Sequence, residues 1–134
     1  MKNHFYQNVR FSKSLKDAFN GLKLIVKNER NFRIDIIVCI VVVFAGFFFE
    51  IAHYDWIALS LLIALVFISE AINSVIEAIC DTVSSEYKVN IRYAKEVSAG
   101  AVLVSTIVSV IAGLIIFMPH VIEYIETLLS LLSI

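Results

Sequence analysis

Three long runs of apolar residues, separated by short polar segments, dominate the chain. They extend from Ile34 to Phe49, from Trp56 to Cys80 and from Val97 to Met118. No strict alternation of apolar and polar residues competes with a helical interpretation, and about 20 mostly apolar residues are enough for a helix to cross the hydrocarbon core of a bilayer. Because a backbone inside lipid must satisfy its own hydrogen bonds, the pattern predicts transmembrane helices at 33–52, 56–80 and 97–118.

Two amphipathic segments flank these runs. From residue 11 to residue 28, apolar residues recur at spacings of three and four, and lysines fill much of the opposite face. This pattern is typical of a helix that lies in the membrane interface, and a simple anchor on anionic lipid is the alternative to a functional role. The tail, 120–134, is also amphipathic but carries only Glu123 and Glu126 as charges, which predicts a helix along the outer surface.

Composition agrees with a membrane protein. Of the 134 residues, 60% are hydrophobic and only 17% are charged, which is less charge than the quarter or so that is usual in soluble domains. We therefore expect one membrane-embedded domain over 1–134, all-α in class. The net charge of −1 gives no reason to expect nucleic acid as a partner. Cys39 and Cys80 both lie inside apolar runs and are expected to be packing thiols.

The distribution of lysine and arginine predicts the orientation in the membrane. Eight of these 11 residues precede the first apolar run, and the other three lie between the second and the third. None lies in the short link between the first two runs, and none follows Met118. Since cytoplasmic segments carry the excess of Lys and Arg, the N-terminus is predicted to be cytoplasmic and the C-terminus to lie outside.

A stripe of polar residues interrupts the second run, in the stretch SEAINSVIEAICD. At 100° per residue, four side chains fall within about 80° of the helix circumference. They are Glu70, Asn73, Glu77 and Asp81, named the polar stripe below. A carboxylate near the bilayer interior costs at least ~2.5–3 kcal/mol, so the stripe must face protein, water or a metal rather than lipid. A helix–helix contact with protonated or paired carboxylates remains the alternative.

The chemistry that suits the polar stripe is phosphoryl transfer. Mg²⁺ is bound by one or two carboxylates together with substrate phosphates, and the neighbouring segment 82–96 carries Lys88, Arg92 and Lys95. A carboxylate at bilayer depth can also accept the proton of a lipid hydroxyl. The four glycines are isolated from one another, so no glycine-rich phosphate loop is present, which excludes kinases of the P-loop and protein-kinase types.

Specific patterns in the chain resemble the bacterial prokaryotic-type diacylglycerol kinase family, which includes undecaprenol kinases. The likeness covers the chain from about Arg10 to Pro119. Three patterns carry it: GLK-(five residues)-ERNFRI from Gly21 to Ile34, EAINSVIEAICD from Glu70 to Asp81, and SEYK followed by AKEVSAGAVL up to Leu103. The resemblance implies three transmembrane helices and an N-terminal surface helix in a homotrimeric bundle, with active sites shared between neighbouring subunits. It also implies a multi-pass protein of the bacterial cell (inner) membrane.

The resemblance also implies roles for individual residues. Glu70 resembles the proton acceptor that contacts the lipid substrate, Glu29 and Glu77 resemble the pair that holds Mg²⁺, and Asp81 resembles a supporting residue. Contacts with ATP are implied for Arg10, Asp17, Glu29, Asn73, Glu77, Glu86, Lys88, Lys95 and Glu96. The chain departs from the family pattern at Glu96, where aspartate is common, and at Lys88, where histidine is frequent.

Together these features predict ATP- and Mg²⁺-dependent phosphorylation of a membrane lipid alcohol at the cytoplasmic face. The run from Ala99 to Leu103 and the Ile-Phe-Met-Pro ending at Pro119 are similar to Gram-positive-type members, which favours undecaprenol as the substrate. Diacylglycerol, converted to phosphatidic acid, is the alternative lipid. The alternative of another class is a small oligomeric channel or assembly subunit lined by the polar stripe, which would have no Mg²⁺-dependent affinity for ATP.

Overall fold

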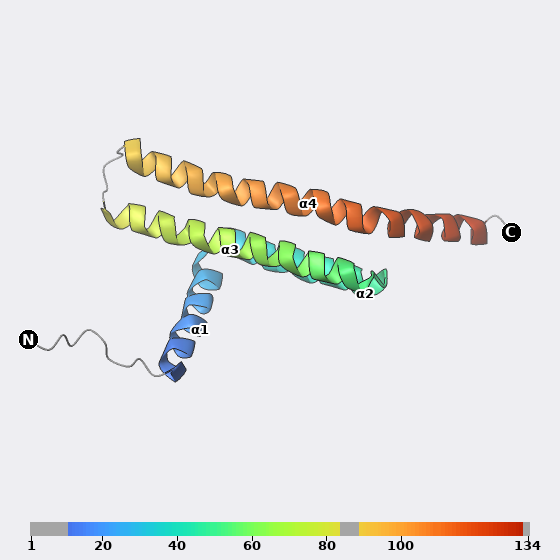
Figure 1. Cartoon of the computed structure of the whole chain (residues 1–134), viewed down its shortest axis with the longest axis horizontal. Helices are drawn as coiled ribbons and strands as arrows, with labels where there is room; N and C mark the ends of the chain where they lie inside the picture. The colour runs from blue at the N-terminus through green and yellow to red at the C-terminus, as the bar shows by residue number, and fades with distance from the viewer. Residues whose placement is uncertain (1–10, 84–88, 133–134) are drawn as a thin grey trace, which may run out of the picture.

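The computed structural model describes residues 11–83 and 89–132, and every element in these two ranges is an α-helix. The helices are α1 (Phe11–Asn28), α2 (Arg30–Phe48), α3 (His53–Val83) and α4 (Val89–Leu132). Figure 1 shows α2, α3 and α4 running alongside one another, while α1 leaves this bundle at a steep angle. The chain is therefore all-helical in its described parts.

The helices α2, α3 and α4 are each long and apolar enough to cross a membrane. Their number and approximate positions agree with the three apolar runs, with shifts at their ends. The first span was expected to reach residue 52, but α2 ends at Phe48 because the chain turns there. Glu50, in that turn, has a left-handed backbone with φ of 51°. The next helix, α3, then begins at His53 and continues to Val83.

The last helix differs most from the expectation. The sequence predicted a span at 97–118 and a separate helix at 120–134, whereas α4 is one helix of 44 residues that contains Pro119. Proline has no N–H to donate and usually kinks a helix, so a break was expected at this point. In the structure the helical backbone is retained on both sides of Pro119 as far as Leu132.

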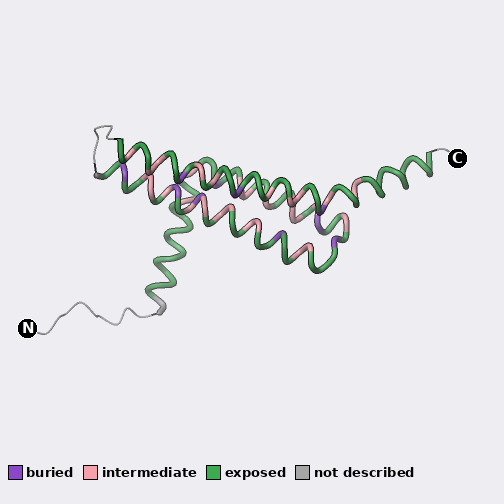
Figure 2. The backbone as a smooth tube through the Cα atoms, turned by 45° about the horizontal axis from the view of Figure 1, so that its top comes forward, coloured by how far each residue is buried: buried purple, intermediate pink, exposed green. Residues whose placement is uncertain are grey.

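The small buried core lies at the end of the bundle where α2 turns into α3. Ile51, Leu59 and Ile116 are buried there, and Trp56 and Phe117 pack against them. Gly46 permits this packing, because a Cβ atom at that position would lie only 2.8 Å from Cη2 of the Trp56 ring. Along the rest of the helices most apolar side chains are exposed (Figure 2), as expected of surfaces that face lipid or other copies of the chain.

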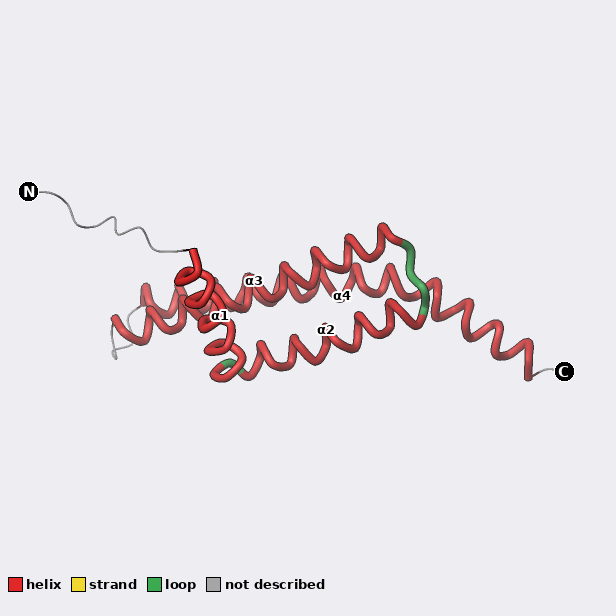
Figure 3. Tube along the Cα trace, turned by 90° about the horizontal axis from the view of Figure 1, so that it is seen from below, coloured by secondary structure: helices red, strands yellow, loops and turns green. Residues whose placement is uncertain are grey.

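A single residue, Glu29, separates α1 from α2. Its N–H donates to the Ile25 carbonyl at 2.8 Å, and its own extended backbone, with φ −94° and ψ 118°, redirects the chain. The Arg33 guanidinium donates to the carbonyls of Val26 at 3.1 Å and Lys27 at 2.9 Å, which satisfies acceptors left open at the end of α1. This junction fixes the steep departure of α1 from the bundle (Figure 3).

The α1–α2 junction lies partway along α3 rather than at its end. The Phe32 ring of α2 packs on the Phe67 ring of α3, with 5.1 Å between the ring centroids. Beyond this level, α3 and α4 continue together past the point where α1 joins α2 (Figures 1 and 3). The polar stripe therefore begins beside the junction and runs along the part of α3 that extends beyond it.

Candidate active site

Glu70 is the most buried residue of the polar stripe, with only 3% of its surface exposed. The Asn31 side chain lies near the Glu70 carboxylate, and the charges of Asp35, Glu29 and Glu77 act on that carboxylate. These neighbours come from the α1–α2 junction, from α2 and from α3. The fold therefore gathers four carboxylates, those of Glu29, Asp35, Glu70 and Glu77, into what is named the acidic cluster below.

The Asn73 side chain forms a hydrogen bond within the polar stripe through one of its two polar atoms, and its other polar atom has no partner in the described residues. It is buried, with 8% of its surface exposed, and its Nδ2 atom donates to Oε1 of Glu77 at 3.2 Å. Its Oδ1 atom is buried and accepts no hydrogen bond within the described part of the chain. An unsatisfied buried acceptor is costly, and amide oxygens are good ligands of hard cations. This atom is thus available to a bound group.

The far end of the polar stripe is tied to α4. Nζ of Lys95 lies 2.5 Å from Oδ1 of Asp81, in an ion pair that is largely exposed to solvent. Nearer the bundle centre, the hydroxyls of Ser69 and Ser105 lie 2.7 Å apart, and Ser105 is buried. These two contacts fix the register between α3 and α4. They bring a lysine ammonium group to the solvent-facing end of the polar stripe.

The donor groups suit a metal ion that arrives with a nucleotide. Among residues 11–83 and 89–132, no three His, Cys, Asp or Glu side chains form a preformed metal cage. Mg²⁺ usually needs only one or two carboxylates, since waters and substrate phosphates complete its octahedral shell. Glu29 and Glu77, which both act on Glu70, together with Oδ1 of Asn73, are oxygen donors of the kind that Mg²⁺ prefers.

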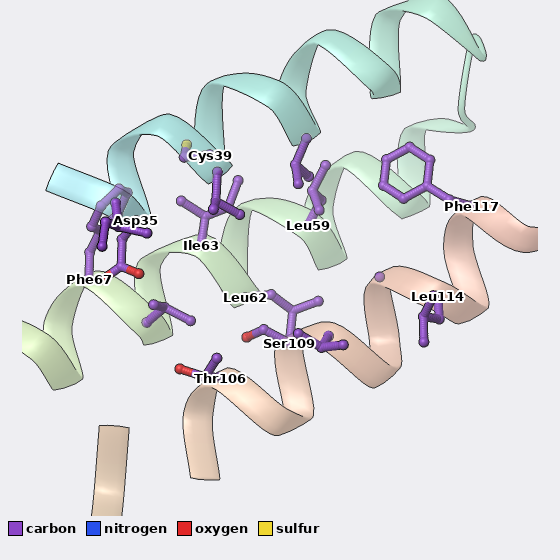
Figure 4. A pocket seen from close by; sticks show the side chains of 16 residues that line it. Asp35, Cys39, Leu59, Leu62, Ile63, Phe67, Thr106, Ser109, Leu114 and Phe117 are labelled. Carbon is purple, nitrogen blue, oxygen red and sulfur yellow. The ribbon is translucent and has the colours of Figure 1, made fainter. Parts of the chain in front are cut away.

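An apolar cavity of about 500 Å³ adjoins the acidic cluster. It lies between α2, α3 and α4, with Asp35 and Phe67 at one end and Phe117 toward the other (Figure 4). Asp35 both lines this cavity and acts on Glu70, so one end of the cavity is close to the buried carboxylate. Its volume falls in the range of small-molecule sites, and its lining suits an apolar chain that carries a polar head at the Asp35 end.

The structure brings some of the predicted site residues together and leaves others apart. Glu29, Glu70, Asn73 and Glu77 come together, and Asp81 and Lys95 pair with each other. Glu96 instead pairs with Arg92 along α4, and Asp17 is exposed on α1. Arg10, Glu86 and Lys88 lie outside the described residues.

Two residues near Glu70 were missed by the sequence analysis. Asp35 is the single carboxylate within the first apolar run, and an isolated charge in a membrane span is by itself a signal of function. Asn31 carries no comparable signal, because it lies in the polar region before that run. Its proximity to Glu70 follows only from the packing of α2 on α3.

Comparison with known proteins identifies the family of the chain. A family model for prokaryotic diacylglycerol kinase matches residues 16–117. Undecaprenol kinase of Bacillus subtilis is 34% identical over 118 residues, which cover 88% of this chain and 96% of that protein. Diacylglycerol kinase of Escherichia coli K12 is 31% identical over 111 residues, which cover 83% of this chain and 91% of that protein. The chain belongs to the prokaryotic diacylglycerol kinase family.

Proposed function

We propose that this lipid kinase transfers the γ-phosphoryl group of ATP to undecaprenol, forming undecaprenyl phosphate and ADP. The observation that carries the proposal is the burial of Glu70 within the acidic cluster and beside an apolar cavity. A carboxylate in that setting can meet a hydroxyl whose apolar chain lies in the membrane. The similarity to an undecaprenol kinase over 96% of that relative supports the choice of lipid.

In the proposed reaction Glu70 is the base. Its carboxylate accepts the proton of the lipid hydroxyl as the hydroxyl oxygen attacks the γ-phosphorus in line, and the bond from that phosphorus to the departing ADP oxygen breaks. Asn31, whose side-chain amide lies near this carboxylate, is proposed to donate to it and hold its orientation. Because Glu70 is nearly excluded from solvent, water is kept away from the oxygen that must receive the phosphoryl group.

Glu29 and Glu77 are proposed to hold Mg²⁺ against the ATP phosphates. When bound, Mg²⁺ neutralises charge on the phosphate oxygens. Asn73 orients the Glu77 carboxylate by donating to its Oε1 atom, and keeps its own Oδ1 free for the bound group. Glu29 occupies the α1–α2 junction, so the surface helix helps to position a metal ligand as well as to contact lipid.

Lys95 is proposed to contact the phosphates, and Asp81 to hold it ready. Their ion pair is exposed, so the ammonium group can exchange one carboxylate oxygen for a phosphate oxygen at little cost. Arg10, Asp17, Glu86, Lys88 and Glu96 complete the proposed ATP contacts on the strength of the family resemblance.

The proposed arrangement in the bacterial cell membrane follows the charge distribution. The N-terminus and the segment between α3 and α4 are cytoplasmic, the C-terminus is outside, and α1 lies in the cytoplasmic interface with its exposed apolar residues, such as Phe19 and Leu22, toward lipid. The large exposed apolar area of the bundle also supports a homotrimer, in which neighbouring copies cover part of that area and contribute to each other's sites.

The test is ATP-dependent phosphorylation by the purified chain in mixed micelles, with undecaprenol and diacylglycerol supplied separately. We expect undecaprenol to be the better substrate and Glu70→Gln, which keeps size and hydrogen bonding, to remove most turnover. The Escherichia coli relative is a diacylglycerol kinase, so diacylglycerol is the second candidate substrate. Preference for diacylglycerol would replace undecaprenol as the proposed substrate. A Glu70→Gln variant with near-normal kcat would show that Glu70 is not the base. Absence of both phosphorylation and Mg²⁺-dependent ATP binding would favour a channel or assembly subunit.

A further inference from the structure

The C-terminal part of α4 extends beyond the bundle. Tyr124 packs on Phe48 and Phe49 at the end of α2, with ring centroids 5.5 and 6.2 Å apart. Past this contact α4 continues alone beyond the α2–α3 turn (Figure 1). Every residue from Ile122 to Leu132 is exposed, and the family match ends at residue 117. The proposed kinase chemistry therefore gives this segment no role.

The segment has one broad apolar face. At 100° per residue, its apolar residues spread over about half of the helix circumference, and its polar residues fall within about 100° on the other side. The apolar side chains are Val121, Ile122, Tyr124, Ile125, Leu128, Leu129, Leu131 and Leu132. The polar ones are Glu123, Glu126, Thr127 and Ser130.

The start of the segment lies level with the polar α2–α3 turn, where we place the membrane boundary. The α2–α3 turn carries polar residues, among them Glu50 and His53, and the Phe48–Tyr124 contact puts Tyr124 at the level of this turn. A straight continuation of α4 would lift the eight residues after Tyr124 by about 12 Å into water. Four leucines would then be exposed to water on one helix face, which the hydrophobic effect opposes.

Two features favour lipid as the occupant of this face. An apolar arc of about half the circumference is broader than the narrow stripe that pairs helices in a coiled coil. The arc also continues the exposed apolar surface that α4 presents along its membrane span, for example at Ile115 and Met118. Since no lysine or arginine follows Pro119 in this segment, docking would depend on apolar burial and not on attraction to anionic head groups.

The backbone at Pro119 allows the change of direction that docking requires. Pro119 cannot donate to the Ile115 carbonyl, and the next carbonyl, that of Ile116, lies 3.0 Å from Nδ1 of the His120 ring. We propose that α4 bends at Pro119 and that Val121 to Leu132 dock their apolar face on the outer surface of the lipid bilayer, over the end of α2. This proposal rests on the membrane-spanning helices alone, so it stands or falls independently of the kinase assignment.

The test compares two neighbouring positions on opposite faces of the segment. The variants Leu128→Cys and Ser130→Cys are each labelled with a nitroxide in the full chain, reconstituted in phosphatidylcholine nanodiscs. Collision rates are measured with oxygen, which concentrates in lipid, and with a water-soluble nickel chelate. The unsubstituted protein, treated with the same label, is the blank for Cys39 and Cys80, and retained ATP-dependent activity shows that both variants are folded.

Docking on lipid predicts opposite results at the two positions. The label at position 128 should collide with oxygen about tenfold more readily, relative to the nickel chelate, than the label at position 130. Ready access of the nickel chelate to both labels would mean that the segment stands in water and would overturn the proposal. Protection of position 128 from both reagents would mean that protein, such as a second copy of the chain, covers the face, and would overturn it as well.

Discussion

At the scale of single residues, Glu77 links the packing of the polar stripe to the proposed chemistry. It receives a hydrogen bond from Asn73 and acts on the buried Glu70. Glu77→Gln keeps an oxygen that can accept the Asn73 bond and removes only the charge. We expect the Mg²⁺ concentration for half-maximal activity to rise by about 10- to 100-fold, because a neutral amide is a weaker ligand for a hard cation.

The matched control for Glu77→Gln is Asp81→Asn, the same chemical change one helical turn further along the polar stripe. Asp81 pairs with Lys95 in an exposed site, so its neutralisation should leave the Mg²⁺ requirement nearly unchanged. Titration of MgCl₂ at saturating ATP measures both variants. Equal shifts for the two variants would mean that Glu77 has no special relation to the metal.

At the scale of helices, the α1–α2 junction determines where Glu29 lies. Arg33 bonds two carbonyls at the end of α1, so Arg33→Ala should let α1 swing and displace Glu29 without changing any proposed ligand. We expect activity at limiting Mg²⁺ to fall about fivefold and to recover at high Mg²⁺, since exposed hydrogen bonds of this kind contribute about 1 kcal/mol. The measurement is the rate of lipid phosphorylation across a range of Mg²⁺ concentrations.

Arg30→Ala is the control for Arg33→Ala, since it removes the same charge from an exposed position in the first turn of α2. It should leave the Mg²⁺ dependence unaltered. If high Mg²⁺ did not restore the activity of Arg33→Ala, the loss of activity would point to general unfolding instead of a displaced ligand.

The helices also show which features can be predicted from a single sequence. The apolar runs predicted three spans, and the spacing from Glu70 to Asp81 placed four side chains on one face, because both patterns are local. The bounds were less accurate, since the turn at Glu50 lies beside the packing of Trp56 on Gly46, and the local pattern around Pro119 does not show that helix continues on both sides of it. Asn31 and Asp35 were missed because they meet Glu70 only through the packing of α2 on α3.

At the scale of the whole molecule, one chain supplies several parts of the proposed site. The charges of Glu29 and Glu77 both act on Glu70 within a single copy, although these residues come from the α1–α2 junction and from α3. The large exposed apolar surface supports association with further copies, which can add other residues to the site. This arrangement raises the question of which proposed ligands come from the same chain.

Co-expression of Glu29→Gln and Glu77→Gln, assayed at a Mg²⁺ concentration too low to support either variant alone, can answer that question. If both metal ligands belong to one chain, as their common effect on Glu70 indicates, each site in a mixed oligomer carries one defect, and activity should stay at the level of the separate variants. If neighbouring chains supplied one ligand each, every mixed trimer would keep one intact site, which is about a third of the sites. Oligomers are purified through two different affinity tags, one on each variant, and assayed for lipid phosphorylation.

The control is wild type co-expressed with Glu77→Gln. It should give intermediate activity, which shows that mixed oligomers form and can turn over. Recovery toward about a third of wild-type activity in the purified mixed trimers would contradict the single-chain assignment of the metal pair.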